Sequence, residues 1–310
     1  MSPLNQALDD YLRLRRSLGF KLERHGRLLP SLVGHLESAG TTTLTTPLAL
    51  DWATALDGKP DEWPVRLSIA RGFARYLQSL DPATEVPPAD LLARKRSRAN
   101  PYLYTEEEVV ALMEATRTLR FPLIMATYHT LVGLLATTGM RIGELIALDR
   151  DDFDRAERTL LVRNAKFNDA RLLPLHQSTV AALGDYADLR NTLWPEPKAP
   201  AYFVSTAGKR LRYENVYATF QHLVRTAGLR PRSARCHPRL HDFRHRMVVV
   251  TLVDWYRHGA DVAARLPALS TYVGHSCPAC TYWYISAAPE LLALAAARRE
   301  QAVQPREHRR

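Results

Sequence analysis

Cysteine, lysine and long apolar runs are all scarce in this chain of 310 residues. Only three cysteines are present, so they cannot all pair with one another inside one chain. No apolar run approaches the ~20 residues that a membrane-spanning helix needs. The first residues, MSPLNQALDDYL, have the polar pattern of a helix start and not that of a signal peptide. These features lead us to expect a globular protein of the cytosol.

Two of the three cysteines, Cys277 and Cys280, have CxxC spacing, and His275 lies close by. One such pair supplies only half of a zinc site, and no second pair with finger spacing follows. No thioredoxin-like strand-to-helix turn surrounds the motif, which a redox role would need. We therefore favour free thiols over a metal or redox site for this pair and for Cys236.

Positive charge is abundant but unevenly distributed. The formal net charge is +10, and only six of the 42 basic residues are lysines. The net charge is +3 over residues 1–100, −3 over residues 101–200 and +10 over residues 201–310. Arginine makes planar bidentate contacts with phosphate, and a basic C-terminal third fits a polyanionic partner. The alternative is a solvated surface that ends in a basic tail.

The length of the chain favours two domains, and the first is expected over residues 1–98. Residues 4–80 carry four apolar stripes at helical spacing, which predict four helices. Prolines at positions 82, 87 and 88 then mark a linker. The linker ends in a basic run, whose charged members are Arg94, Lys95, Arg96 and Arg98. We favour a strap along a phosphate backbone over a solubilising charge cluster for this run.

The second domain is expected over residues 99–300, followed by a basic tail at 301–310 that we expect to be disordered. Thr105 and Glu108 have capping-box spacing, and a long apolar helix from Phe121 to Thr138 ends at Gly139. Residues 159–163 and 171–175 change to the period of two strands joined by a turn. Helical patterns occupy 142–148, 178–192, 213–227, 240–258 and 289–299. The chain is therefore expected to be mainly α with a small β-sheet.

Five residues of the second domain combine cations, imidazoles and a phenol without paired carboxylates: Arg141, His241, Arg244, His275 and Tyr284. Paired carboxylates would indicate a bound metal or glycoside chemistry. Two arginines with a tyrosine indicate instead a phosphate that is held without metal while the phenol attacks it. We therefore expect neither a metal nor a cofactor.

Four segments resemble motifs of the tyrosine recombinase, or phage integrase, family. Thr138 to Leu145 resembles its "TGxRxxEL" segment, and His241 to His245 resembles its "HxxRH" segment. Val273 to Ser276, with Tyr284 nine residues after the histidine, resembles its "LGH…Y" segment. Residues 164–166 before 171–175 resemble the hairpin that carries the catalytic lysine. The resemblance implies an N-terminal helical, SAM-like core-binding domain and a C-terminal catalytic domain.

The same resemblance implies a role for each matched residue. Arg141 and Arg244 would hold the non-bridging oxygens of a DNA phosphodiester, and His275 would donate a further hydrogen bond. Tyr284 would attack phosphorus to form a 3′-phosphotyrosine. Its phenol has an ordinary pKa of ~10 and needs a base or a cationic environment. By resemblance His241 is the base, and Lys166 is the acid that protonates the leaving 5′-oxygen. Glu144 is expected to orient a neighbouring arginine or histidine.

Two of these assignments had competitors in the sequence. Tyr272 and Tyr282 also lie near His275, and only the nine-residue step selects Tyr284. The family usually has glycine after its lysine, whereas Phe167 follows Lys166 here, and Asp169 occupies the later basic position. No other lysine lies between Lys95 and Lys198, so none nearby can replace Lys166.

The resemblance also implies partners and a setting. A recombinase would bind double-stranded DNA, act as a homotetramer on two DNA sites with or without accessory proteins, and work at the bacterial nucleoid in the cytoplasm. Residues 281–284 and 289–292 resemble those of recombinases from mobile elements, which favours a role in DNA integration or transposition. The apolar stretch 291–295 could dock on a neighbouring protomer or pack on its own domain. Two alternatives remain, a type IB topoisomerase-like enzyme and a catalytically silent DNA-binding protein of the same fold.

Overall fold

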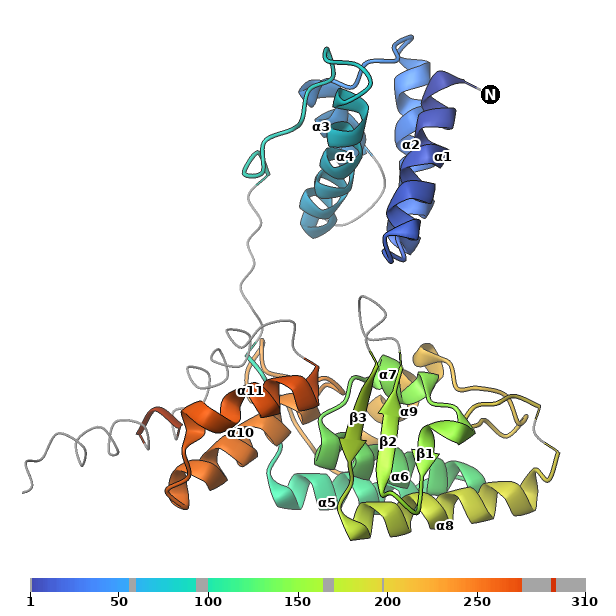
Figure 1. Ribbon diagram of the computed structural model, residues 1–310, viewed down its shortest axis with the longest axis vertical. Coiled ribbons are helices and arrows are strands. Elements are labelled where there is room, and N and C mark those ends of the chain that lie inside the picture. The colour runs from blue at the N-terminus through green and yellow to red at the C-terminus, as the bar shows by residue number, and fades with distance from the viewer. Residues whose placement is uncertain are drawn as a thin grey trace, which may run out of the picture. The chain divides into compact units, whose positions relative to one another are not determined.

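The computed structural model of the protein describes residues 2–55, 60–92, 100–163, 170–196, 198–274 and 291–293 (Figure 1). The chain divides into two compact units, residues 1–98 and residues 99–310. Helices dominate both units, and the second unit adds a three-stranded sheet. The expected fold class, mainly α with a small β-sheet, is confirmed.

The first unit is built from the four helices that its apolar stripes predict. They are α1 (Pro3–Ser17), α2 (Glu23–Ser38), α3 (Thr46–Ala55) and α4 (Trp63–Gln78), with the 3₁₀ turn η1 (Pro60–Glu62) before α4. Leu32, Leu36 and Phe73 are fully buried where three of the helices meet. Trp52 of α3 closes the same core. Burial of one stripe per helix is what stabilises a unit of this size.

The second unit is organised around one long apolar helix. Its helices are α5 (Glu106–Ala115), α6 (Pro122–Thr138), α7 (Ile142–Ala147), α8 (Gln177–Leu193), α9 (Tyr213–Thr226), α10 (Asp242–Arg257) and α11 (Val262–Val273), with the 3₁₀ turns η2 (Thr116–Thr118) and η3 (Arg150–Asp152). Helix α6 contacts α5, α8 and α10. Thr105 and Glu108 form the expected capping box at the start of α5. Gly139 ends α6 with φ +60°, a left-handed conformation that favours glycine.

The sheet is antiparallel with the order β1-β2-β3 (Figure 1). Its strands are β1 (Phe153–Asp154), β2 (Thr159–Val162) and β3 (Arg171–Pro174). The sequence predicted β2 and β3, whereas β1 has only two residues and shows no readable period. In the register, Leu160 faces Leu173 and Val162 faces Arg171. Leu160, Val162 and Leu173 are fully buried, so one face of the ribbon packs on the core.

Helices α10 and α11 lie side by side and enclose a smaller apolar cluster (Figure 1). The sequence patterns did not predict α11, because Pro267 lies in its interior and proline ordinarily ends a helical pattern. Leu291, from the described residues 291–293, is fully buried in this cluster. At Leu291, therefore, the apolar stretch packs on its own chain.

None of the helices within the described ranges is long and apolar enough to cross a membrane.

Candidate active site

The turn between α6 and α7 carries the first predicted site residue. It consists of Gly139, Met140 and Arg141, and Arg141 directly precedes α7. The turn is tight, because a Cβ at Gly139 would lie 3.3 Å from Met247 of α10. A glycine is therefore needed both for the positive φ and for the close approach of α10.

Arg141 is held on both sides of its guanidinium. Nη1 donates to Oε1 of Glu144 at 2.7 Å, and Nη2 donates to the carbonyl oxygen of Gly274 at 2.8 Å. Its backbone N–H donates to the other carboxylate oxygen of Glu144 at 2.9 Å. The side chain is 40% exposed. Arg141 is thus fixed in orientation while part of its side chain remains open to solvent.

Arg244 approaches the same turn from the first turn of α10. It is 2% exposed, and Nη1 donates to the carbonyl oxygen of Gly139 at 3.0 Å. Gly139 lies two residues before Arg141. The structure therefore brings together two of the cations that the sequence predicted, although 103 positions separate them in the chain.

His241 directly precedes α10. Part of its surface is open to solvent, and surrounding protein atoms desolvate the rest of the ring. Its ring centroid is 5.0 Å from that of His245 in an edge-on arrangement. Desolvation lowers the pKa of His241, and the positive charges of Arg244, Arg141 and Arg239 lower it further. A neutral imidazole beside two arginines can accept a proton at neutral pH. The three residues Arg141, His241 and Arg244 are thus close enough to influence one another.

An ion pair with a buried carboxylate anchors the start of α10. Nε and Nη2 of Arg239 donate to the two carboxylate oxygens of Asp242, each at 3.0 Å. Asp242 is fully buried. Desolvation raises the pKa of Asp242, although the hydrogen bonds from Arg239 oppose the shift. The hydroxyl of Tyr104 donates to the carbonyl oxygen of Arg239 at 3.0 Å, and its ring stacks on Phe243. This arrangement orients the helix turn that carries His241 and Arg244.

Sequence reasoning did not find Arg171, the first residue of β3. Its Nη1 and Nη2 donate to the two carboxylate oxygens of Glu144 at 3.2 and 2.8 Å, and its Nε donates to the carbonyl oxygen of Tyr272 at 2.9 Å. Burial alone would raise the pKa of Glu144, but hydrogen bonds from Arg171 and Arg141 outweigh it and lower that pKa. The expectation that Glu144 orients an arginine is confirmed.

Three of the predicted catalytic residues lie outside the described residues: Lys166, His275 and Tyr284. The same holds for the basic run, Arg94, Lys95, Arg96 and Arg98, and for Cys277 and Cys280. Their described neighbours belong to the site. Gly274, whose carbonyl oxygen accepts from Arg141, directly precedes His275, and β3 begins five residues after Lys166.

Tyr272, a competitor for the nucleophile, has a packing role. It contacts both apolar clusters of the second unit, and its hydroxyl donates to the carbonyl oxygen of Pro174 at 3.5 Å. Burial raises the pKa of its phenol, and the charge of Arg171 opposes that shift only in part. A raised pKa disfavours the phenolate that attack on phosphorus needs.

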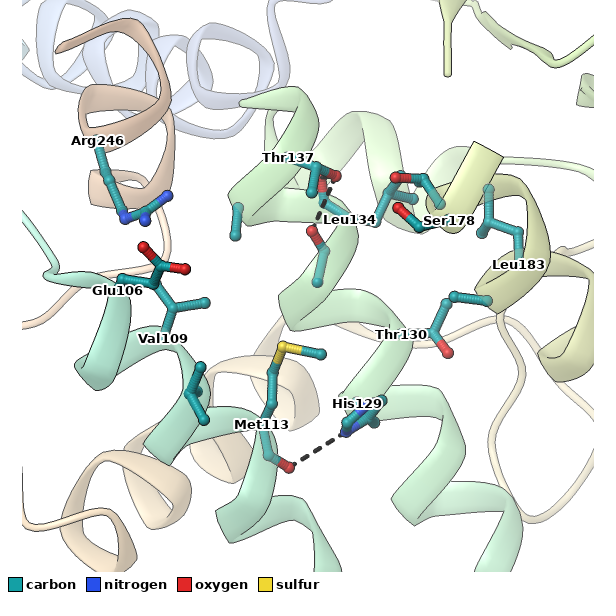
Figure 2. Close-up of a pocket in the computed structure, with 15 residues that line it drawn as sticks. Glu106, Val109, Met113, His129, Thr130, Leu134, Thr137, Ser178, Leu183 and Arg246 are labelled. Atoms are coloured by element: carbon teal, nitrogen blue, oxygen red, sulfur yellow. Dashed lines mark hydrogen bonds between the residues drawn. The ribbon is translucent and has the colours of Figure 1, made fainter. Parts of the chain in front are cut away.

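A separate cavity of about 330 Å³ lies between α5, α6, α8 and α10 (Figure 2). Val109, Met113 and Leu134 form much of its apolar lining, and Figure 2 shows Glu106 and Arg246 pointing toward one another at one end. Of the predicted catalytic residues that the structure describes, Arg141, His241 and Arg244, none lines it. Within the described residues, no group of three or more His, Cys, Asp or Glu side chains could hold a metal ion.

The model of the phage integrase family matches residues 103–290. The chain belongs to this family. It is 41% identical over 308 residues to a Sinorhizobium fredii protein named integrase/recombinase y4rB, an alignment that covers 97% of this chain and 98% of that protein. It is 30% identical over 218 residues to the tyrosine recombinase XerC of Alcanivorax borkumensis, which covers 70% of this chain and 66% of XerC. The chain is therefore a tyrosine-type site-specific recombinase.

Solved structures agree in fold. The integrase of the transposon Tn1549, in complex with transposon right end DNA, superposes with a TM-score of 0.63 at 17% identity, covering 95% of this chain and 98% of that chain. A lambda integrase tetramer bound to a Holliday junction gives a TM-score of 0.60 at 18% identity, covering 91% and 76%. The relatives favour a recombinase over a topoisomerase-like enzyme or a silent protein.

Proposed function

We propose that the protein cuts and rejoins double-stranded DNA through a 3′-phosphotyrosine on Tyr284, and that it acts in integration or transposition. One observation carries the proposal: Arg244 donates to the turn that presents Arg141, which brings the two cations together. His241 is near enough for the positive charges of both arginines to lower its pKa. Such a cluster can neutralise the charge that develops on the non-bridging oxygens of an attacked phosphodiester.

The chemistry assigns one proton transfer to each end of the reaction. The phenol oxygen of Tyr284 attacks phosphorus while its proton passes to the neutral ring of His241. The bond from phosphorus to the 5′-oxygen breaks, and that oxygen takes a proton from Lys166. Arg141, Arg244 and His275 hold the non-bridging oxygens. Reversal by a 5′-hydroxyl of another strand rejoins the DNA, so neither ATP nor a cofactor is consumed.

The remaining parts of the chain extend this proposal. Residues 1–98 serve as a core-binding domain, and the basic run from Arg94 to Arg98 lies along the phosphate backbone of the bound duplex. Four protomers act on two DNA sites, as in the solved assembly of lambda integrase. The transposon integrase and the integrase/recombinase y4rB support a mobile-element role. The protein would then work on DNA of the bacterial cytoplasm.

The test uses double-stranded fragments from the DNA that flanks the coding region, incubated with the protein in EDTA without ATP. A 3′-phosphotyrosine keeps the 5′-labelled part of the cut strand on the protein and releases a 3′-labelled part with a free 5′-hydroxyl. Denaturing gels should therefore show a protein-linked band from 5′-labelled strands alone. Tyr284→Phe should bind the same fragment and form no such band. A 3′-labelled band on the protein, or a band with Tyr284→Phe, would contradict the proposal.

A further inference from the structure

Arg171 joins three segments that are far apart in the chain. Arg171 is the first residue of β3. Its guanidinium donates to the carboxylate of Glu144 on α7 and to the carbonyl oxygen of Tyr272 near the end of α11. All three of its nitrogens are used in these hydrogen bonds. The side chain is only 10% exposed, so it contributes little to the surface that DNA could reach.

The pair with Glu144 has the geometry of a strong, orienting contact. Glu144 is 5% exposed at its side chain, and each of its oxygens accepts from one nitrogen of Arg171. Bidentate pairs of this kind fix the plane of both groups, and a buried carboxylate without its partner is costly. Arg171 therefore keeps Glu144 charged and in one orientation.

The same contacts fix both groups that hold Arg141. Oε1 of Glu144 accepts from Arg171 and also from Nη1 of Arg141. The second acceptor of Arg141 is the carbonyl oxygen of Gly274. Gly274 is in close contact with Arg171, because a Cβ added at Gly274 would lie 2.8 Å from Nη1 of Arg171. The guanidinium of Arg171 therefore contacts both residues whose oxygens accept from Arg141.

Arg171 also connects this pair to the flanks of the residues that complete the proposed site. It faces Val162 in the register of β2 and β3, the two strands that enclose the segment with Lys166. It also contacts Tyr272 and Gly274, which lie three residues and one residue before His275. One side chain thus sets the mutual position of three motif segments.

We propose that Arg171 is a positioning residue for DNA cleavage, which acts through Glu144 and Gly274 to hold Arg141 in its phosphate-binding orientation. The inference rests on the proposed function, because it concerns the cleavage step. Lysine cannot replace arginine here, since an ammonium group is a point charge that cannot match both carboxylate oxygens and the Tyr272 carbonyl at once. A misplacement of about 1 Å in such a site costs roughly 100-fold in rate.

The test measures two quantities for each variant: DNA affinity by gel mobility shift, and the single-turnover rate of covalent adduct formation on a nicked substrate. Arg171→Lys should bind DNA within about threefold of wild type and form adduct roughly 100-fold more slowly. The matched control is Arg163→Lys, which keeps the charge beside Asp152 and lies directly after β2 in the same ribbon. Arg163 pairs with the buried carboxylate of Asp152 at 2.7 Å and has no hydrogen bond to Glu144 or Tyr272. This control should cleave at close to the wild-type rate.

A double variant separates positioning from general loss of structure. Arg171→Lys and Glu144→Gln break the same ion pair, so together they should lose about as much rate as the worse single change. The inference is overturned if Arg171→Lys cleaves within about threefold of wild type, if the loss follows DNA affinity, or if the two losses multiply. Thermal melting shows which variants are folded. If Arg171→Lys does not fold, Glu144→Gln alone tests the contact between Arg171 and Glu144. If wild type itself forms no adduct, the proposed function fails instead.

Discussion

Nη1 of Arg244 donates a 3.0 Å hydrogen bond to the carbonyl oxygen of Gly139. This bond ties the first turn of α10 to the turn before α7, so the two arginines predicted to hold phosphate share one support. The contact also uses the left-handed conformation of Gly139, which aims its carbonyl toward α10. The cationic cluster is therefore a property of the α6–α7 turn as much as of the arginines themselves.

Because Arg244 must both donate to Gly139 and hold phosphate, we predict that lysine cannot replace it. Arg244→Lys should keep the fold but lower the single-turnover cleavage rate about 100- to 1,000-fold, the range for loss of one donor to a developing oxyanion. An ammonium group cannot donate to Gly139 and present a fork to phosphate together. Arg257→Lys, an exposed change at the other end of α10, is the control. Equal rates for the two variants would show that Arg244 does not contact the reacting phosphate.

His241 gives the reaction a pH dependence whose direction is set by its neighbours. Its pKa is lowered below 6.5 by desolvation and by Arg244 and Arg141. The ring therefore stays neutral, and able to accept a proton, until the pH falls through that lowered pKa. The acid limb of kcat/KM for cleavage against pH, which reports the DNA-free protein, should have its midpoint below pH 6.5. The folded state binds this proton less readily than the unfolded state does. The free energy of unfolding should therefore also fall as the pH drops below 6.5. A kinetic midpoint above 6.5 would exclude His241 as the base.

Glu144 links the site to acid stability. Its folded pKa lies below the ordinary value of 4.5, so its contribution to stability is present above pH 4.5 and is lost as pH falls through the folded pKa. Glu144→Gln should destabilise the protein at pH 7 by about 3 kcal/mol, because it removes one partner of a buried ion pair. Urea unfolding of both proteins between pH 3 and pH 7 checks this. The difference between them should shrink toward acid pH, and a constant difference would contradict the assignment.

Gly274 is predicted to tolerate no side chain. A Cβ there meets Arg171 at 2.8 Å, and its φ of +69° is unfavourable for alanine. Gly259 is a matched control, with φ +68° and no atom within 4 Å of an added Cβ. Both alanine variants should share a backbone cost of about 1 kcal/mol, measured by thermal unfolding. Gly274→Ala alone should also slow cleavage, and equal cleavage rates would show that contact with Arg171 is unimportant.

The sequence predicted the motif residues because their types and spacings are local. Arg141 follows a glycine turn, and His241 and Arg244 lie one helical turn apart. Both patterns can be recognised within a few consecutive residues, without knowledge of the fold. Arg171 was read only as a strand residue, because its partners come from α7 and α11, and no local pattern predicts contacts over such separations. Helix α11 was missed for a different reason, since Pro267 interrupts the pattern that would have revealed it.

The choice of nucleophile among nearby tyrosines tests the account most directly. Trypsin should release residues 266–298 as one peptide, because Arg265 and Arg298 are consecutive cleavage sites, and this peptide contains Tyr272, Tyr282 and Tyr284. The measurement is fragmentation mass spectrometry of this peptide after covalent reaction with DNA and nuclease digestion. The account predicts a nucleotide attached to Tyr284 alone. A nucleotide on Tyr282 or Tyr272 would contradict it.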